Sequence, residues 1–452
     1  MQDIILDIES LDMEGRGIGH LHNEDGTPGK VIFVEGALAG ERVSFSTYRK
    51  KPKWEAANMT ALHRESSMRV KPECAYFGLC GGCAMQHLEP SAQVAAKQRV
   101  LEDSLWHIGK LKAENILRPV YGPTWGYRYR ARISVRNVPK KGGVLVGFHE
   151  RRSSFITDMT SCRILPAHVS ALLVPLRHLI ASMDAMDALP QIELAIGEGE
   201  GDKQVTVLVL RHMTPLIAED ESKLRAFADL HDVQWWLQPE GPDSAYPFYP
   251  AQSDLHYTLP EFDVRMPFKP TDFTQVNHQI NRVLVSRALR LLDIAPGERV
   301  ADLFCGLGNF TLPIATRAAS VVGIEGSTAL TGRATDNAAA NGLSDKVEFY
   351  CRNLFEATAQ DFVALGKFDR MLIDPPRDGA QAVCQAMIDL GTLAPQLKPR
   401  RIVYVSCSPG TLARDAGMLT QEGGYALKHA GVVNMFPHTA HVESIAVFDL
   451  IA

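Results

Sequence analysis

The sequence predicts an α/β protein whose C-terminal part is a doubly wound sheet. From about residue 267 onward, apolar runs typical of buried strands alternate with longer helical stretches. The first sixty or so residues instead carry short alternating runs separated by glycine-containing turns, and residues 165–265 mix strand and helix patterns. A chain of 452 residues is long enough for two or three domains. We therefore expect domains at 1–66, 67–265 and 266–452.

The composition is that of an ordinary soluble globular protein, with 46% hydrophobic and 22% charged residues. Because the formal net charge is -5, any contact with nucleic acid must come from local basic patches. The start, MQDIILDIES, is acidic and lacks the pattern of a signal peptide, and no apolar run reaches membrane-spanning length. These features predict a cytoplasmic protein without a membrane partner.

The N-terminal segment predicts a small β-barrel of the OB type. Its runs ILDIES, EGRGIGH, KVIFVEG and ERVSFSTY have strand length and are separated by turn signals. The segment closes with RKKPKW, in which four positive residues precede Trp54: Arg49, Lys50, Lys51 and Lys53. A solvated loop and an RNA contact are equally good interpretations of this cluster.

Four cysteines between residues 74 and 162 predict a metal centre. Cys74, Cys80 and Cys83 form C-x5-C-x2-C, and Cys162 is the one other cysteine before the C-terminal part. Three close thiolates plus one remote thiolate is a ligand count of iron–sulfur and zinc sites. Zinc sites more often use two close pairs, so the arrangement favours a [4Fe–4S] cluster, with a structural rather than a redox role. A helix from Ser91 to His107 is expected between Cys83 and Cys162.

A basic stretch follows that helix. Residues 115–149 contain no acidic side chain, and a strand over GYRYRARISVRN would place four arginines on one face: Arg128, Arg130, Arg132 and Arg136. A solvated sheet surface normally mixes both signs of charge. We therefore favour a phosphate-binding face over a merely solvated one.

The run VADLFCGLGNF predicts a cofactor turn after a strand. Gly306 and Gly308 would let a cofactor approach the backbone, but Thr311 stands where dinucleotide sites have a third glycine, which disfavours a pyrophosphate. Glu325 ends the next strand, where a carboxylate can bind ribose hydroxyls, and Asn353 follows the third strand on the adenine side. This order resembles the S-adenosylmethionine site of class I methyltransferases.

Two further strand ends carry candidate reactive groups. The strand FDRMLID ends in Asp374-Pro375-Pro376-Arg377, a turn that in adenine amino-methyltransferases continues with an aromatic residue and in cytosine-C5 RNA methyltransferases holds a cysteine. Here neither is present. Cys407 follows the next strand, in YVSCSPGTLARD, where Ser408-Pro409-Gly410 must end that strand. Taken alone, Cys407 reads more readily as a packing cysteine than as a nucleophile.

The pieces FTQVNHQIN, VADLFCGLGNFTLPIA, IEGS, IDPPRDG, YVSCSPGTLARD and MFPHTAHVESIAVF together resemble the RNA uracil-C5 methyltransferases. With the four cysteines and the N-terminal segment, which resembles a TRAM domain, the chain is most similar to the bacterial 23S rRNA members that carry an iron–sulfur cluster. The resemblance spans nearly the whole chain and is weakest at 165–265. It implies a class I (Rossmann-like) methyltransferase domain at 266–452, a TRAM domain at 1–66 and a central α+β iron–sulfur domain at 67–265.

The resemblance also implies roles for individual residues. Cys407 would add to uracil C6, and Glu443 would then remove the C5 proton to release 5-methyluridine. Asp374 would contact either the cofactor or the uracil edge. The implied residues that line S-adenosylmethionine are Gln275, Phe304, Asn309, Glu325, Asn353 and Asp374, and the implied cluster ligands are Cys74, Cys80, Cys83 and Cys162.

The implied substrate is 23S rRNA at a uridine of the 1939 type, presented as a flipped or single-stranded base. We expect no DNA or membrane partner, and a monomer. The same chemistry on another rRNA or tRNA uridine is the nearest alternative. An iron–sulfur oxidoreductase is disfavoured by Thr311, and a non-catalytic RNA-binding protein by the joint presence of Cys407, Glu443 and Asp374.

Overall fold

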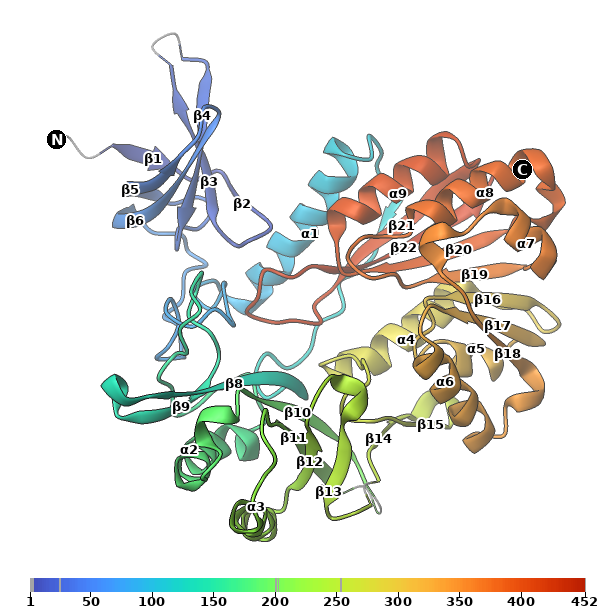
Figure 1. Cartoon of the computed structure of the whole chain (residues 1–452). Helices are drawn as coiled ribbons and strands as arrows, with labels where there is room; N and C mark the ends of the chain where they lie inside the picture. The colour runs from blue at the N-terminus through green and yellow to red at the C-terminus, as the bar shows by residue number, and fades with distance from the viewer. Residues whose placement is uncertain (1–3, 24–25, 200, 202, 253, 452) are drawn as a thin grey trace.

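The computed structural model describes residues 4–451 except 24–25, 200, 202 and 253, and its strands form three sheets (Figure 1). The sheets follow one another along the chain, with one exception that is described below. Among the described residues, no helix combines the length and the apolar character needed to cross a membrane.

The first sheet has six strands in the order β1-β5-β6-β4-β3-β2. Its two edge strands, β1 and β2, are consecutive in the chain, with only Ile8 and Glu9 between them. The amide of Ile8 donates to the carbonyl of Glu41 (2.8 Å), and that of Glu9 donates to the carbonyl of Ile18 (2.7 Å). One stretch of chain therefore bridges both edges around a small apolar core, while the OB-type and TRAM assignments remain predictions. The strands are β1 (Ile5–Asp7), β2 (Ser10–Leu11), β3 (Gly17–His22), β4 (Pro28–Glu35), β5 (Arg42–Lys50) and β6 (Trp54–Arg64).

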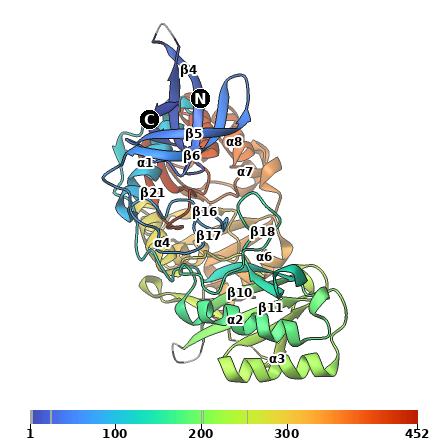
Figure 2. The ribbon, with the colours of Figure 1, turned by 90° about the vertical axis from the view of Figure 1, so that its left-hand side faces the viewer.

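The second sheet spans residues 130–267 and carries two helices on one face (Figure 2). Successive residues of its strands face opposite cores: Leu194 and Leu208 pack with these helices, whereas Ala195 and Val209 face the C-terminal part of the chain. The elements are β8 (Arg130–Val138), β9 (Gly143–Gly147), α2 (Ala167–Ser182), β10 (Gln191–Glu198), β11 (Gln204–Arg211), α3 (Ala218–His231), β12 (Gln234–Gln238), β13 (Tyr246–Tyr249), β14 (His256–Leu259) and β15 (Val264–Pro267).

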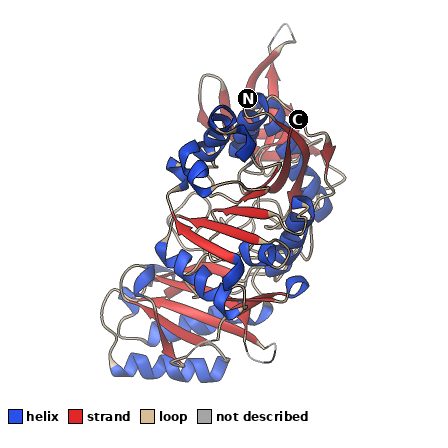
Figure 3. Ribbon diagram, turned by 90° about the vertical axis from the view of Figure 1, so that its right-hand side faces the viewer, coloured by secondary structure: helices blue, strands red, loops and turns tan. Residues whose placement is uncertain are grey.

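The third sheet is the predicted doubly wound sheet, with the strand order β18-β17-β16-β19-β20-β22-β21-β7. All neighbouring strands are parallel except β22, which is antiparallel to both β20 and β21. Figure 3 shows helices on both sides of its strands. The elements are α4 (His278–Leu292), β16 (Arg299–Leu303), α5 (Thr311–Ala315), β17 (Ser320–Glu325), α6 (Thr328–Ala340), β18 (Val347–Cys351), α7 (Ala359–Leu365), β19 (Arg370–Ile373), α8 (Gln381–Leu393), β20 (Arg401–Ser406), α9 (Pro409–Gln421), β21 (Tyr425–Val433) and β22 (Glu443–Leu450).

The two faces of this sheet have separate cores. Helices α4, α5 and α6 pack with Val300, Val321 and Val403 on one face, and helices α7, α8 and α9 pack with Ala301 and Tyr404 on the other. Parallel strands covered on both faces need nearly continuous apolar runs, which is why these strands could be found from the sequence.

Two elements from the predicted central domain join the third sheet. The first is α1 (Pro90–His107), which packs against α9 and β21, and the second is β7 (Asn115–Ile116), which pairs with β21. The Glu89 carboxylate accepts from the amides of Ser91 (2.7 Å) and Ala92 (3.1 Å) at the start of α1, where sequence also placed the helix. The domain boundaries at 66 and 265 remain predictions, with residues 1–3 and 452 outside the described part.

The expected four-arginine face is wrong in part. Strand β8 does alternate, with Ile133 buried and Arg132 exposed, but it begins at Arg130. Residues 270–276 cover that end of the strand, so the Arg130 guanidinium is largely buried and donates to the carbonyl of Pro270 (2.7 Å). Arg132 is paired with Glu193 (2.9 Å). Arg128 lies before the strand and faces a cavity instead of a sheet surface.

Candidate active site

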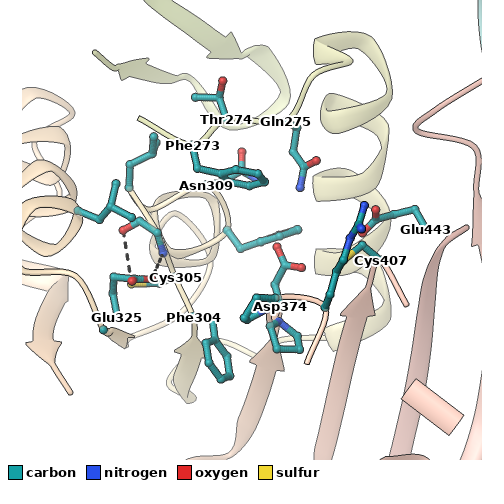
Figure 4. A pocket seen from close by; sticks show the side chains of 18 of the residues that line it. Phe273, Thr274, Gln275, Phe304, Cys305, Asn309, Glu325, Asp374, Cys407 and Glu443 are labelled. Carbon is teal, nitrogen blue, oxygen red and sulfur yellow. Dashed lines mark hydrogen bonds between the residues drawn. The ribbon is translucent and has the colours of Figure 1, made fainter. Parts of the chain in front are cut away.

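A cavity of about 610 Å³ lies at the carboxyl ends of β16, β17, β19 and β20 (Figure 4). In an open α/β sheet this edge is where ligands bind. The structure brings together here all eight residues that sequence predicted for catalysis and cofactor binding: Gln275, Phe304, Asn309, Glu325, Asn353, Asp374, Cys407 and Glu443. Their individual roles remain predictions.

The turn after β16 depends on left-handed backbone. Phe304, Gly306 and Gly308 have φ values of 62°, 56° and 97°, a region that glycine adopts freely and phenylalanine does not. The Glu325 carboxylate accepts from the amides of Gly306 (3.1 Å) and Ser327 (3.0 Å). These two hydrogen bonds hold the carboxylate at the rim of the turn, where it faces the cavity.

The contacts of Thr311 explain why threonine, and not a third glycine, stands at this position. Its hydroxyl donates to the carboxylate of Asp302 (2.5 Å), which is completely buried beneath the turn. Burial raises the pKa of Asp302 to about 8, and the hydrogen bond from Thr311 opposes that rise. A glycine at 311 would leave this acid without its hydroxyl donor.

Aromatic and amide groups line the side of the cavity near Glu325. The rings of Phe304 and Phe355 lie 5.7 Å apart, and the Asn353 side chain accepts from the amide of Phe355 (3.1 Å). Apolar ring faces beside an anchored amide suit a planar heterocycle.

The second sheet also contributes to this cavity, which the sequence did not reveal. Tyr257 of β14 donates to the side-chain oxygen of Asn309 (2.9 Å), and Asn281 of α4 donates to the same oxygen (2.8 Å). The Asn309 side chain is thereby fixed by two elements far apart in sequence. Other lining residues that sequence reasoning did not place here are Arg128, Phe273, Thr274, Phe436 and His441.

Cys407 lies between β20 and α9, and its side chain is half-buried. The amide of Ser408 donates to the Ser406 hydroxyl, and that hydroxyl donates to the Ser408 carbonyl, each at 3.1 Å. The strand therefore ends where the sequence predicted. Pro409 and Gly410 open a helix directly after it, and the tight turn directs Cys407 toward the cavity (Figure 4).

Acidic groups converge on the thiol. Burial raises the pKa of Cys407 to about 11, with further contributions from the charges of Glu443 and Asp374 and an opposing one from Arg377. Burial also raises the pKa of Glu443 to about 8 and that of Asp374 to about 7. Carboxyl groups whose pKa values lie near neutrality can take up and release protons at physiological pH.

A second cavity, of about 670 Å³, reaches Cys407 from the side of the first sheet. It lies between the turn around Asp12–Arg16, helix α1 and residues 440–442. Cys407, Arg377 and His441 line both cavities. The thiol can therefore meet one ligand from each side.

The four predicted metal ligands, Cys74, Cys80, Cys83 and Cys162, line one small pocket. The amide of Gly82 donates to the sulfur of Cys80 (3.4 Å). Within the described residues, however, no group of three or more histidine, cysteine, aspartate or glutamate side chains has the arrangement of a formed metal site. The thiols are gathered but not in coordination geometry, so their role as ligands remains a prediction.

Comparison with known proteins decides the family. A family model described as tRNA (Uracil-5-)-methyltransferase matches residues 255–449. A protein of Cupriavidus pinatubonensis named 23S rRNA (uracil(1939)-C(5))-methyltransferase RlmD is 65% identical over 447 residues, covering 99% of this chain and 96% of its own. A relative of the same name from Ralstonia pickettii is 64% identical, covering 98% of each chain. This chain belongs to the RlmD family.

The RlmD family assignment confirms the predicted resemblance to RNA uracil-C5 methyltransferases. Among solved structures, the tRNA (uracil-54, C5)-methyltransferase of Pyrococcus abyssi in complex with S-adenosyl-L-homocysteine matches with a TM-score of 0.70 and 22% identity. The match covers 98% of this chain and all of the other. It shows that the chain has the fold of that class I methyltransferase.

Glu325 gives a first testable prediction. Replacing it with alanine should weaken binding of S-adenosylmethionine by about ten- to a hundredfold, because a ligand would lose charge-assisted hydrogen bonds and Gly306 would lose its partner. Calorimetric titration with the cofactor measures the change. Glu356→Ala, at a carboxylate outside the cavity, is the matched control, and equal affinity in both variants would contradict the assignment.

Proposed function

We propose that this chain methylates C5 of a uracil in 23S rRNA, at a site of the 1939 type, with S-adenosylmethionine as methyl donor. The observation that carries the proposal is the meeting of two cavities at Cys407, with Glu443 and Asp374 beside it. The names of the relatives support the choice of substrate. We also propose that the chain acts as a monomer, since the described part of one chain supplies all of these residues.

Cys407 would act first. Uracil C5 is a poor nucleophile, and addition of the thiolate to C6 moves electron density to C5 as an enolate. With a pKa of about 11, the thiol is mostly protonated at neutral pH, and the positive charge of Arg377 favours its ionisation. S-adenosylmethionine, when bound, would supply an electrophilic methyl group on a positively charged sulfur.

Glu443 would act last, by removing the C5 proton so that the Cys407–C6 bond can break. A base works best when its pKa lies near the operating pH, and burial brings the pKa of Glu443 to about 8. Asp374, with its carboxyl group at the same end of the sheet, would hold the uracil edge or the cofactor. Gln275, Phe304, Asn309, Glu325 and Asn353 would line the cofactor.

The second cavity would admit the RNA. It is bounded by the N-terminal sheet, which we propose to be a TRAM-type barrel, and a base flipped out of its stack could reach Cys407 through it.

The basic cluster predicted from sequence lies at the β5–β6 turn, with the Arg49 guanidinium 5.4 Å from the Trp54 ring centre. The Trp54 ring is half-buried, and a cation beside a partly accessible aromatic ring suits contact with RNA.

We further propose that Cys74, Cys80, Cys83 and Cys162 hold a [4Fe–4S] cluster. The fit rests on the shared pocket and on electrostatics. Burial raises the pKa of Cys83 to about 12 and that of Cys162 to about 11, and the charges of the neighbouring thiols add to each rise. Thiols whose pKa values are raised in this way need a cation to become thiolates, and bound iron would provide it.

Replacing Cys162 with alanine should therefore abolish iron binding. Iron and acid-labile sulfide would be measured per chain after anaerobic purification, together with the visible absorption of the protein. Cys351→Ala, at an exposed thiol outside the pocket, should keep the full metal content. Zinc in place of iron in the unaltered protein would contradict the proposed cluster.

The proposed function is tested by mapping 5-methyluridine in rRNA and tRNA with mass spectrometry, in cells with and without the gene. We expect loss of the modification at one 23S rRNA uridine and its recovery with the intact gene, but not with Cys407→Ala. Loss at a tRNA site instead would assign the same chemistry to another substrate.

A further inference from the structure

The loop of residues 434–442 connects β21 to β22 and ends at Glu443, the first residue of β22. Phe436 and His441 of this loop line the main cavity, and His441 lies within 3.2 Å of the Arg377 guanidinium. The position of the loop therefore sets where Glu443 and its neighbours face the substrate.

His438, in the middle of this loop, is held by several contacts. Its φ of 65° is in the left-handed region, and its side chain is 3% exposed. Its carbonyl accepts from the amides of both Ala84 and Met85 (2.9 Å each), and its own amide donates to the side chain of Gln93 (2.8 Å). Such a backbone conformation persists only where the surroundings enforce it.

The imidazole ring of His438 is held as well. It stacks on Trp125 with the ring centres 3.9 Å apart and the planes inclined by 26°. Its Nδ1 lies 3.2 Å from the amide nitrogen of the Gln93 side chain.

These contacts link His438 to both cysteine-bearing segments, directly to the first and through Trp125 to the second. Ala84 directly follows Cys83 in the chain. On the other side, Arg163 directly follows Cys162, and its guanidinium lies 5.0 Å from the Trp125 ring centre. Arg163 also forms an ion pair with Glu73, which precedes Cys74. His438 thus links the 434–442 loop directly to the segment that follows Cys83 and, through Trp125, to the segment that contains Cys162.

The start of the loop has a separate anchor. The Lys97 ammonium of α1 donates to the side chain of Asn434 and to the carbonyl of Phe436, each at 2.8 Å. Neither contact involves a cysteine segment. Tyr127 adds a further anchor, since its hydroxyl donates to the carbonyl of Pro437 (2.9 Å). The contacts of His438 follow these two anchors in the chain and precede the residues that lead to Glu443.

We propose that His438 is a positioning residue that couples the cysteine segments to Glu443. The inference rests on the proposed function, because it takes Glu443 as the base that completes the reaction. When the stacking of His438 on Trp125 is lost, the loop shifts and proton removal from C5 becomes slower. The rate at which Cys407, at the end of β20, adds to C6 stays unchanged. A contact chain of this kind counts as coupling only if its members act together in a measurement.

The test uses the full-length protein with an RNA fragment that contains the target uridine. His438→Asn keeps a residue that tolerates left-handed backbone but removes the stacked ring. With ordinary uridine we expect kcat to fall about tenfold at nearly unchanged KM, as for an interaction that acts only after binding. The covalent RNA–protein adduct should accumulate on denaturing gels, because the methylated intermediate waits for proton removal.

With 5-fluorouridine RNA, the adduct should form at the rate of the unaltered protein, because its formation does not include proton removal from C5. The adduct then persists, since fluorine at C5 cannot leave as a proton. Trp125→Leu should reproduce the phenotype, and the double variant should be no slower than either single variant. His231→Asn, which removes a ring 4.3 Å from Phe227 on α3, is the matched control and should behave as the unaltered protein.

The outcomes separate the two proposals. If the unaltered protein traps no 5-fluorouridine RNA, the proposed function fails. If the unaltered protein does trap this RNA, two results would overturn the coupling. In the first, the His438→Asn variant turns over ordinary uridine at the normal rate, and in the second it slows adduct formation and release equally. If circular dichroism shows that His438→Asn does not fold, Trp125→Leu carries the same test.

Discussion

Replacing Cys407 with alanine is expected to abolish methyl transfer, with a loss of at least about four orders of magnitude in rate. Without the sulfur no bond forms at C6, and C5 stays too poor a nucleophile to take up the methyl group. The fold should tolerate the change, because the side chain is half-buried at a turn that Ser406 and Ser408 hold by themselves. Incorporation of labelled methyl groups into the RNA fragment measures the effect.

A second readout isolates the bond itself. With 5-fluorouridine RNA, the unaltered protein should form an adduct that survives denaturation, and Cys407→Ala should form none. Cys351→Ala, which removes an exposed thiol beside Thr328, should trap the RNA normally. Full activity of Cys407→Ala would leave the proposed mechanism without its nucleophile.

The residues that sequence placed in the site share a local signature. Glu325, Asp374 and Cys407 each follow a run of apolar residues, and the carboxyl ends of parallel strands meet at one edge of a sheet. Reading the strands was therefore enough to bring these side chains together. Glu443 is different, because it begins an antiparallel strand, and the family resemblance rather than the strand pattern pointed to it.

The residues that sequence missed depend on contacts between distant parts of the chain. Tyr257 belongs to the second sheet and reaches the cavity because that sheet packs with the helix α4 side of the third. Arg128 was assigned to a basic strand face, yet the strand begins two residues later and its side chain turns into the cavity. No periodicity along a single strand carries such information.

The electrostatics of the acid cluster were likewise visible only in three dimensions. Sequence named Cys407, Glu443 and Asp374 as a set, but their burial side by side, which raises the pKa values of the thiol and of Glu443, needed the structure. Mutual repulsion and burial act in the same direction, and both keep protons on the cluster at neutral pH. The reaction should accordingly become faster as pH rises from 6 to 9.

Replacing Glu443 with glutamine should stall the reaction after methyl transfer. The amide nearly preserves the size of the buried side chain, but it cannot accept the C5 proton, so Cys407 stays bonded to C6. We expect turnover to fall by about two to four orders of magnitude, the range that a general base contributes. A single-turnover experiment with ordinary uridine should show methylated RNA bound covalently to the protein.

The raised pKa of Glu443 also predicts how the release step depends on pH. In the unaltered protein, release should speed up as pH passes through about 8, because Glu443 must lose its proton before it can act as the base. Release by the glutamine variant should lack that inflection, whereas formation of its adduct should keep the pH dependence of the Cys407 thiol, which lies at higher pH. Glu422→Gln, at an exposed carboxylate after α9, is the matched control. Rapid release by Glu443→Gln with the inflection intact would assign proton removal to another group, and Asp374 would be the first to replace.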